Sequence, residues 1–235
     1  MVLLAAGCVH QPVSGTNNEV RFPPPVSSSQ APAAAPKVPK HANFEQEMKS
    51  EVVRQVADWV FDSGDNGGLN FAIIDKIDAK VYVFDPNGRL RGAAPVLLGL
   101  SKGDDTVPGI GDKSLSEIRP ADRTTPAGRF LASMGDNISG KDVLWIDYKD
   151  ALSMHRVITS NPKEHRLERL ASPKPTEHRI SFGCINVPAD FFDKVVKPSF
   201  TGTGGMVYIL PEIRPIKEVF VTYYEVEKGP EKVSN

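Results

Sequence analysis

Residues 179–188 read Arg-Ile-Ser-Phe-Gly-Cys-Ile-Asn-Val-Pro, and they contain one of the two cysteines of the chain, Cys184. The preceding Gly183 lets the backbone approach a ligand closely. The pattern from Pro188 to Val196 predicts a short helix with proline in its first turn. We expect the start of this helix to lower the pKa of the thiol and to provide N–H donors for an oxyanion. These features are typical of a cysteine nucleophile, although a lone cysteine is more often a small buried side chain.

A cysteine nucleophile needs a base, and three histidines lie within reach in the sequence. His155 ends the alternating stretch Leu152-Ser-Met-His155, which predicts a strand. Because a strand holds a catalytic group more firmly than a loop does, His155 ranks first. His178, on the approach to the cysteine, ranks second. His165 ranks third because it lies in a charged stretch that predicts a solvated helix.

Outward from this segment, short strand patterns dominate the chain. Turn signals such as Asp85-Pro-Asn-Gly88 separate them. The sum predicts a mainly β domain with a few helices over residues 69–226. The expected strands are 71–74, 81–84, 93–100, 129–134, 143–148, 151–157, 206–210 and 219–226, and residues 101–123 and 158–179 are expected to form long loops.

Before this domain, residues 43–63 predict an amphipathic helix. Asn43 is a candidate N-cap, with Gln46 as its capping partner. Apolar residues recur from Phe44 through Met48 to Val60 at helical spacing. We expect this helix to pack on the following domain.

The first 42 residues have two compositions. Residues 1–8, Met-Val-Leu-Leu-Ala-Ala-Gly-Cys, resemble the end of a truncated bacterial lipoprotein signal, in which Cys8 would carry the lipid. Residues 9–42 are rich in Pro, Ser and Ala, which predicts a disordered tether. We therefore expect a location in the periplasm or cell envelope, with a lipid anchor to the membrane through Cys8 as an option. The alternative is a disordered tail without function.

Composition excludes several other classes of protein. The chain has 28 Lys and Arg against 29 Asp and Glu in 235 residues, so no basic excess favours nucleic acid as a partner. No apolar run approaches the length that spans a bilayer. Two cysteines are too few for a disulfide scaffold or a four-cysteine zinc site.

Two motifs carry a resemblance to a known family. Ser181-Phe-Gly-Cys-Ile-Asn186 is similar to the Ser/Thr-His-Gly-Cys-hydrophobic-Asn/Arg signature of the L,D-transpeptidase catalytic domain, the YkuD-like fold, with Phe182 in place of the histidine. Thr125-Pro-Ala-Gly-Arg-Phe130 is similar to a second motif of that family, Thr-Pro-x-Gly-x-Phe/Tyr. The resemblance covers residues 69–211 in the same order along the chain.

The resemblance implies a β-sandwich or barrel-like fold with the cysteine at the rim of a groove. It implies that Cys184 attacks a peptidoglycan stem tetrapeptide, forms an acyl-enzyme and makes 3→3 cross-links, without a cofactor. His155 would be the base and the carbonyl of Arg156 would orient it. The amides of Gly183 and Cys184 would bind the oxyanion.

Further residues have lesser implied roles. Ser181 and Asn186 would shape the loop. Arg179, beside the groove, is a candidate ligand for the carboxylates of the stem peptide, and so is Arg156. Phe182 would line the substrate site.

Three alternatives remain open. Water could be the acceptor, which would make the protein a peptidoglycan hydrolase or carboxypeptidase. The loss of the motif histidine at Phe182 would also suit a non-catalytic wall-binding module. A zinc site built from Cys184 and two histidines is disfavoured because the spacing matches no zinc motif, so no metal ligand is assigned.

Overall fold

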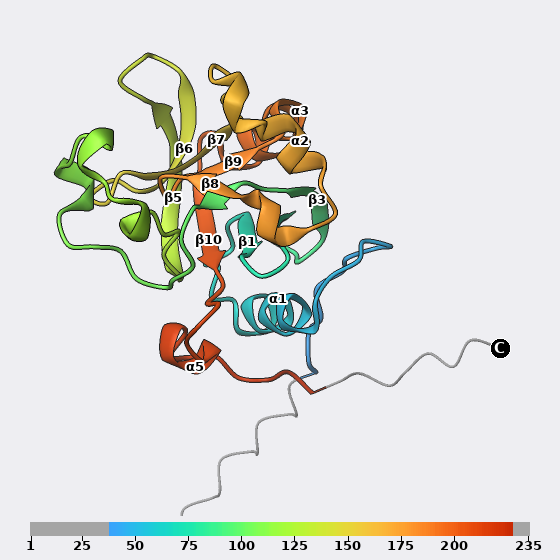
Figure 1. Ribbon diagram of the computed structural model, residues 1–235. Coiled ribbons are helices and arrows are strands. Elements are labelled where there is room, and N and C mark those ends of the chain that lie inside the picture. Colours follow the sequence, from blue (N-terminus) through green and yellow to red (C-terminus); the bar gives the residue numbers. More distant parts are fainter. Residues whose placement is uncertain (1–37, 228–235) are drawn as a thin grey trace, which may run out of the picture. The chain divides into compact units, whose positions relative to one another are not determined.

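The computed structural model describes residues 38–227 (Figure 1). The predicted signal-like end at 1–8 and most of the tether at 9–42 lie outside these residues, and the described residues belong to the compact unit that begins at Val38. Within the described part of the chain, no helix combines the length and apolar character needed to cross a membrane.

An eight-stranded sheet dominates this unit, in the order β3-β2-β1-β10-β5-β6-β7-β9. Most neighbours are antiparallel, whereas β1–β10 and β7–β9 are parallel pairs. The strands are β1 (Phe71–Asp75), β2 (Lys80–Phe84), β3 (Leu90–Pro95), β5 (Gly128–Asp136), β6 (Asp142–Asp147), β7 (Leu152–Arg156), β9 (Ile185–Val187) and β10 (Gly205–Ile209).

The two edges of this sheet approach each other. Leu97, just after β3, exchanges two backbone hydrogen bonds of 2.8 and 2.9 Å with Asn186 in β9. A small parallel pair, β4 (Leu98–Gly99) and β8 (Arg179–Ser181), continues this seam. The sheet is therefore nearly closed, and the prediction of a mainly β, barrel-like fold with few helices is confirmed.

Side-chain alternation along the strands produces two apolar cores. The inner core includes Val81, Ala132 and Met154, with Phe192 and Phe200 from the helical stretch after β9. That stretch comprises α3 (Ala189–Phe191), a π-helical turn (Phe192–Val196) and α4 (Lys197–Phe200), close to the helix predicted at 188–196. The outer core lies between α1 (Glu51–Ser63) and the opposite faces of β1, β2 and β10.

The helix α1 is shorter than predicted. Ser50, not Asn43, is its N-cap, and Gly64 ends it in a left-handed conformation. Asn43 instead pairs with Arg89, and Met48 is 82% exposed. Phe44 lies outside the helix, before a turn, but is buried in the outer core. Its apolar side chain therefore extended the helical pattern of the sequence by a turn that the structure does not contain.

Residues 38–42 also differ from the predicted tether. The amide of Lys40 donates to Asp62, and both the amide of Ala42 and the ring of His41 bind Asp58. Since Asp58 and Asp62 are one turn apart on α1, the chain is attached to that helix before residue 43.

The predicted strand at 219–226 is wrong. The chain forms the short helix α5 (Ile216–Val219) and an irregular segment instead. Phe220, Tyr223 and Val226 are buried against α1, and their spacing of three leaves no strand alternation. Figure 1 shows this segment beside α1, below the sheet.

The two long loops contain short helical segments, of which only the solvated helix around His165 was predicted. Residues 110–122 hold three 3₁₀ turns (Ile110–Asp112, Leu115–Glu117 and Pro120–Asp122). Residues 162–178 hold a 3₁₀ turn (Pro162–Glu164), the helix α2 (Arg166–Ala171) and a last 3₁₀ turn (Pro175–His178). The strands β8 and β9, three residues each, flank the Cys184 loop and were also missed.

Candidate active site

Cys184 lies directly before β9, not at a helix start as predicted. The register of β7 with β9 pairs His155 with Asn186, which brings Ser153 level with the cysteine. The Ser153 Oγ lies 3.5 Å from the Cys184 Sγ, and the thiol also lies 3.4 Å from the carbonyl oxygen of Ala151. The thiol is partly exposed at the seam of the sheet.

The pKa of the Cys184 thiol lies below its ordinary value. Burial alone would raise this pKa, but a hydrogen bond with His155, the charge of that ring and a hydrogen bond with Ser153 outweigh burial. The sequence attributed the shift to a helix dipole, whereas the structure attributes it to the strand β7. A lowered pKa increases the fraction of reactive thiolate near neutral pH.

Of the three histidines, His155 is the one that lies on the strand next to β9 and lowers the pKa of the Cys184 thiol. It lies near the end of β7, and its Nδ1 is 2.8 Å from the carbonyl oxygen of Arg156. When Nδ1–H donates to that carbonyl, Nε2 is left as the acceptor that can take a proton from the thiol. The imidazole of His155 thus lies between the thiol and the Arg156 carbonyl, which is the order that a nucleophile, its base and an orienting group would need.

The other two histidines are occupied elsewhere. His178 is 2% exposed, and its two ring nitrogens lie 2.9 and 3.0 Å from the carbonyl oxygens of Val96 and Ser172. His165 is exposed and lies 3.6 Å from Glu168. Neither histidine has a contact with Cys184 in the described residues.

The loop 181–184 is fixed from within by Ser181. The Ser181 Oγ donates to the carbonyl of Cys184 at 2.6 Å and accepts the amide of Gly183 at 3.1 Å. The Gly183 amide is therefore already bonded, which contradicts its predicted role as an oxyanion donor. The amide of Cys184 is the remaining predicted donor.

Gly183 has a different requirement. Its φ is +135°, and a Cβ there would lie 2.8 Å from the backbone oxygen of Thr124. Its carbonyl accepts the Oγ1 of Thr125 at 2.7 Å. Only glycine fits this position, and the two sequence motifs meet in this hydrogen bond. The sequence analysis identified Thr125 as part of a motif but did not predict its hydrogen bond with the Gly183 carbonyl.

A hollow of about 100 Å³ opens beside the thiol. Its walls come from the loop 106–118, the turn 150–152 and the loop 182–184. The lining is mostly apolar and includes Phe182, for which the family resemblance implies a place in the substrate site. Two charged residues that the sequence analysis missed, Lys113 and Asp150, also line it.

The loop 106–118 is docked closely on the turn that precedes β7. A Cβ on Gly111 would lie 2.1 Å from the carbonyl oxygen of Lys149. This contact is between backbone segments, so only a residue without a side chain permits it. The loop therefore forms one wall of the hollow through a close backbone approach.

Arg156 and Asn186 have supporting positions. The guanidinium of Arg156 is paired with Asp142 at 2.7 Å and with Asp193, so it is not free to bind a substrate carboxylate. Asn186 donates through Nδ2 to the carbonyl of Cys184 at 3.3 Å and accepts from Arg166 at 2.7 Å.

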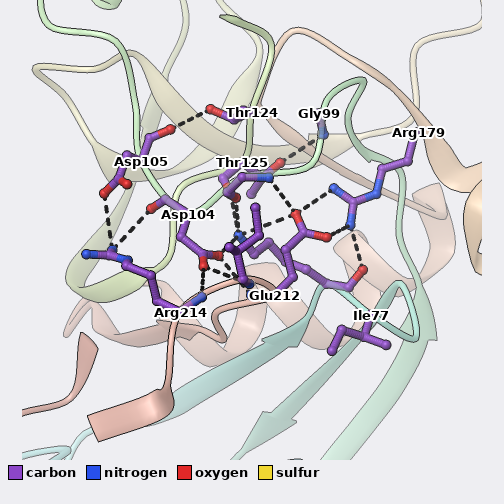
Figure 2. Close-up of polar contacts among 12 residues, drawn as sticks. Ile77, Gly99, Asp104, Asp105, Thr124, Thr125, Arg179, Glu212 and Arg214 are labelled. Carbon is purple, nitrogen blue, oxygen red and sulfur yellow. Dashed lines mark hydrogen bonds and ion pairs between the residues drawn. The ribbon is translucent and has the colours of Figure 1, made fainter. Parts of the chain in front are cut away.

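Arg179 was predicted to bind substrate, but the structure places it in a buried ion cluster (Figure 2). It is 9% exposed and forms a two-point ion pair with Glu212, with a shortest distance of 2.6 Å. It lines a different hollow from the one at Cys184. The cluster is defined by two cations and two anions, Lys76, Arg179, Asp104 and Glu212.

Lys76 lies at the centre of this cluster. It is 1% exposed, and its Nζ donates to Asp104 at 2.8 Å, to the carbonyl of Thr125 at 2.9 Å and to that of Gly103 at 2.5 Å. Burial lowers the pKa of Lys76, although Asp104 and Glu212 oppose the shift. All three ammonium protons have acceptors, which offsets the cost of burying the charge.

The buried carboxylate of Asp104 accepts hydrogen bonds from protein groups in place of water. Burial would raise its pKa, but the hydrogen bond from Lys76 and the amides of residues 212–214 hold the pKa at about 2. Figure 2 shows Asp104 and Glu212 side by side between Arg179 and Arg214.

Over residues 38–227, no group of three or more His, Cys, Asp or Glu side chains is arranged to hold a metal ion. His155 and His178, two of the three histidines considered as zinc ligands, have their Nδ1 atoms against backbone carbonyls.

Comparisons with known proteins give structural neighbours but no relatives by sequence. No family model matches the chain, and no curated protein matches it. An L,D-transpeptidase from Xylanimonas cellulosilytica is 15% identical, with a TM-score of 0.37 over 60% of this chain and 60% of that chain. The helical cell shape determining protein Pgp2 from Campylobacter jejuni is 13% identical, with a TM-score of 0.40 over 62% and 49%.

A third neighbour is the catalytic domain of the E. faecium L,D-transpeptidase, 16% identical, with a TM-score of 0.33 over 60% of this chain and 96% of that domain. The chain covers only 49% to 60% of the length of three L,D-transpeptidase structures, those from Xylanimonas and two others. In fold, the chain is similar to L,D-transpeptidase structures, at identities of 13% to 16%.

Proposed function

We propose that the protein is a cysteine-dependent L,D-transpeptidase of the bacterial cell wall, acting on peptidoglycan stem peptides in the cell envelope. The observation that carries the proposal is the register of β7 with β9, which puts His155 beside the Cys184 loop, where its ring lowers the pKa of the thiol and its Nδ1 faces the Arg156 carbonyl. This pairing lies beside a hollow open to a ligand. The motifs around Cys184 and Thr125 support the same interpretation.

In the first half-reaction, His155 takes the proton of the thiol and the Cys184 sulfur attacks the carbonyl carbon of a stem peptide. The amide of Cys184 stabilises the oxyanion. The bond between that carbon and the nitrogen of the terminal D-alanine then breaks, and His155 returns its proton to the departing amine. A thioester remains on Cys184.

In the second half-reaction, the amine of another stem peptide attacks the thioester carbonyl. His155 removes a proton from this amine as the new amide bond forms, and the Cys184 sulfur departs as the thiolate. If water attacks instead, the product is a shortened stem peptide. The hollow is mostly apolar, which limits water at the thioester and favours the amine as acceptor.

The charged residues of the hollow suit this substrate. The ammonium of Lys113 can attract the carboxylate of the terminal D-alanine, and Asp150 can attract the incoming amine. Lys113 is exposed, so we expect its contribution to binding to be modest.

The test is mass spectrometry after incubation of the full chain with a disaccharide-tetrapeptide. A dimer that has lost one D-alanine, with a transient acyl adduct on Cys184, is the expected result. A tripeptide without dimer would replace transpeptidation with hydrolysis. Unchanged substrate without an adduct would overturn the proposal and favour a wall-binding module.

The lipid anchor is a separate proposal. We propose that Cys8 carries a diacylglyceryl group when a complete signal sequence precedes it, which intact-mass measurement of the chain produced in bacteria behind such a signal, with Cys8→Ala as control, would test. The described residues begin after this segment, so the proposal rests on the sequence 1–8 alone.

A further inference from the structure

The loop that bears the nucleophile is fastened at two points to the same buried ion cluster. One fastening is on β8, where Arg179 begins the strand that leads to Ser181. The other is on the Gly183 carbonyl, which accepts the hydroxyl of Thr125. We propose that Thr125 is a positioning residue for the Cys184 thiol and that the buried ion cluster fixes Thr125. The inference rests on the proposed role of Cys184 as the nucleophile.

Thr125 is bound through both its side chain and its backbone. It is fully buried, its Oγ1 accepts the amide of Gly99 at 2.9 Å, and the same Oγ1 donates to Gly183. Its carbonyl accepts the ammonium of Lys76 at 2.9 Å. The threonine thus connects the cluster, β4 and the nucleophile loop. Figure 2 shows Thr125 beside Gly99 and the cluster.

The cluster joins segments that are far apart in the sequence. Lys76 follows β1, Asp104 lies in the long loop, and Glu212 follows β10. The amide of Gly103 donates to Glu212 at 3.0 Å, and Arg179 donates to the carbonyl of Lys76 at 2.8 Å. Each charge of the cluster has a partner, so movement of one segment would leave a buried charge unpaired. An unpaired buried charge strongly lowers the free energy of unfolding, and the cluster therefore resists such movement.

The consequence for catalysis is geometric. The pKa of the thiol depends on its hydrogen bonds with His155 and Ser153, which are held on β7. The thiol itself is carried by the loop 181–184, and the hydrogen bonds of Thr125 and Ser181 hold this loop in place. A shift of the loop would lengthen the contact with His155, and the thiol would return toward its ordinary pKa.

The experiment measures thiol reactivity in the full chain. Alkylation of Cys184 by iodoacetamide is followed from pH 5 to pH 10, with peptide mapping to separate Cys184 from Cys8. The variants are Thr125→Val, which keeps the shape but loses the hydroxyl, and Thr125→Ser, which keeps the hydroxyl. Thr201→Val is the control, because the hydroxyl of Thr201, the C-cap of α4, also donates to a backbone carbonyl, that of Lys197 at 2.7 Å, but lies outside the cluster and the nucleophile loop.

We expect Thr125→Val to move the midpoint of the alkylation profile upward and to lower the rate at pH 7 about tenfold. Thr125→Ser should restore the rate to within about twofold, and Thr201→Val should match the unaltered chain. A Thr125→Val profile equal to that of the unaltered chain would overturn the inference. So would a Thr125→Ser profile as poor as that of Thr125→Val, or an equal loss in Thr201→Val.

Glu212→Gln tests the cluster itself if Thr125→Val does not fold. The amide keeps the size of the side chain but loses one acceptor for Arg179. A smaller upward shift of the same profile supports the inference, and an unchanged profile overturns the role of the cluster.

Iodoacetamide needs no cell-wall substrate, so the two proposals fail separately. A chain whose thiol responds to Thr125 but which leaves stem peptides unchanged would overturn the proposed function alone.

Discussion

The guanidinium of Arg123 lies over the ring of Phe182, with its central carbon 3.9 Å from the ring centroid. Phe182 stands where the related signature has a histidine, and its ring lines the hollow beside the thiol. Arg123 also donates to the carbonyl of Ile118 at 3.2 Å from two of its nitrogens. A cation is therefore fixed next to the position from which the imidazole is missing.

Phe182→Ala should alter binding more than chemistry. The phenyl ring makes no hydrogen bond with Cys184, so the rate of alkylation of the thiol should change by less than about threefold. Loss of the ring and of its contact with Arg123 should raise KM for stem peptides about tenfold, because the wall of the hollow is removed. Steady-state kinetics would show the difference, and a fall in kcat with constant KM would contradict it.

Cys184→Ala should abolish turnover while the chain stays folded. The thiol is a partly exposed group with weak contacts, so the melting temperature should change by no more than about 3 °C. Intact-mass measurement after incubation with substrate should show no adduct on Cys184→Ala. Residual turnover close to that of the unaltered chain would exclude the thiol as the nucleophile.

His155→Gln and His165→Gln form a matched pair of substitutions. His155 contacts the thiol, so its replacement should lower kcat/KM by about 10² to 10⁴. His165 is exposed beside Glu168, so its replacement should leave kcat/KM unchanged. The opposite ranking would transfer the role of base to His165.

Acid should weaken the buried ion cluster through Asp104. Its pKa is about 2 in the folded chain, against an ordinary value of 3.8, so the unfolded chain takes up a proton first as the pH falls. The stabilisation is therefore complete above about pH 5 and is lost between about pH 4 and pH 2, with a size of roughly 2 kcal/mol.

Thermal unfolding of Asp104→Asn would test this dependence. The variant should melt below the unaltered chain at pH 6, and the gap should narrow toward pH 2.5. Asp112→Asn is the control, since Asp112 is an exposed carboxylate in the long loop. A gap that stays constant with pH would show that Asp104 does not titrate in this way.

Gly111→Ala should displace the loop 106–118. The new Cβ would lie 2.1 Å from the Lys149 carbonyl, so one backbone segment has to move. The hollow should widen, KM for stem peptides should rise about tenfold, and alkylation of Cys184 should be no slower. Ser116→Ala on the same loop serves as the control. Unchanged KM would mean that this loop wall does not bind the substrate.

Local patterns in the sequence predicted the strands that bury one or both faces. The apolar runs at 71–74 and 81–84 correspond to β1 and β2. They could be predicted because a continuous apolar run is visible in the local sequence, without knowledge of the partner strands. The three-residue strands β8 and β9 were too short for a period to be visible. The start of α1 was misplaced since Phe44 is buried by the sheet rather than by a helical turn.

Within the candidate site, the sequence located Cys184 and ranked His155 first, because both lie in local patterns. The partners of Arg179 could not be predicted in the same way. Glu212 is 33 positions away, and Lys76 is 103 positions away. Long-range ion pairs of this kind have no periodic signature, so an arginine near the motif was interpreted as a substrate ligand.

The seam between Leu97 and Asn186 also has a kinetic consequence. These residues are 89 positions apart, and the parallel pairing of β1 with β10 is still less local. Because loop closure of this length makes such contacts slow to form, the seam should close late as the chain folds. Cys184 lies two residues before Asn186, so the loop of the thiol gains its support on the Leu97 side only when the sheet closes, whereas its neighbour His155 comes with the more local β7–β9 pair. A chain that has not yet closed this seam therefore has β9 paired on one side only, and the hydrogen bonds between Leu97 and Asn186 complete the support of the Cys184 loop last.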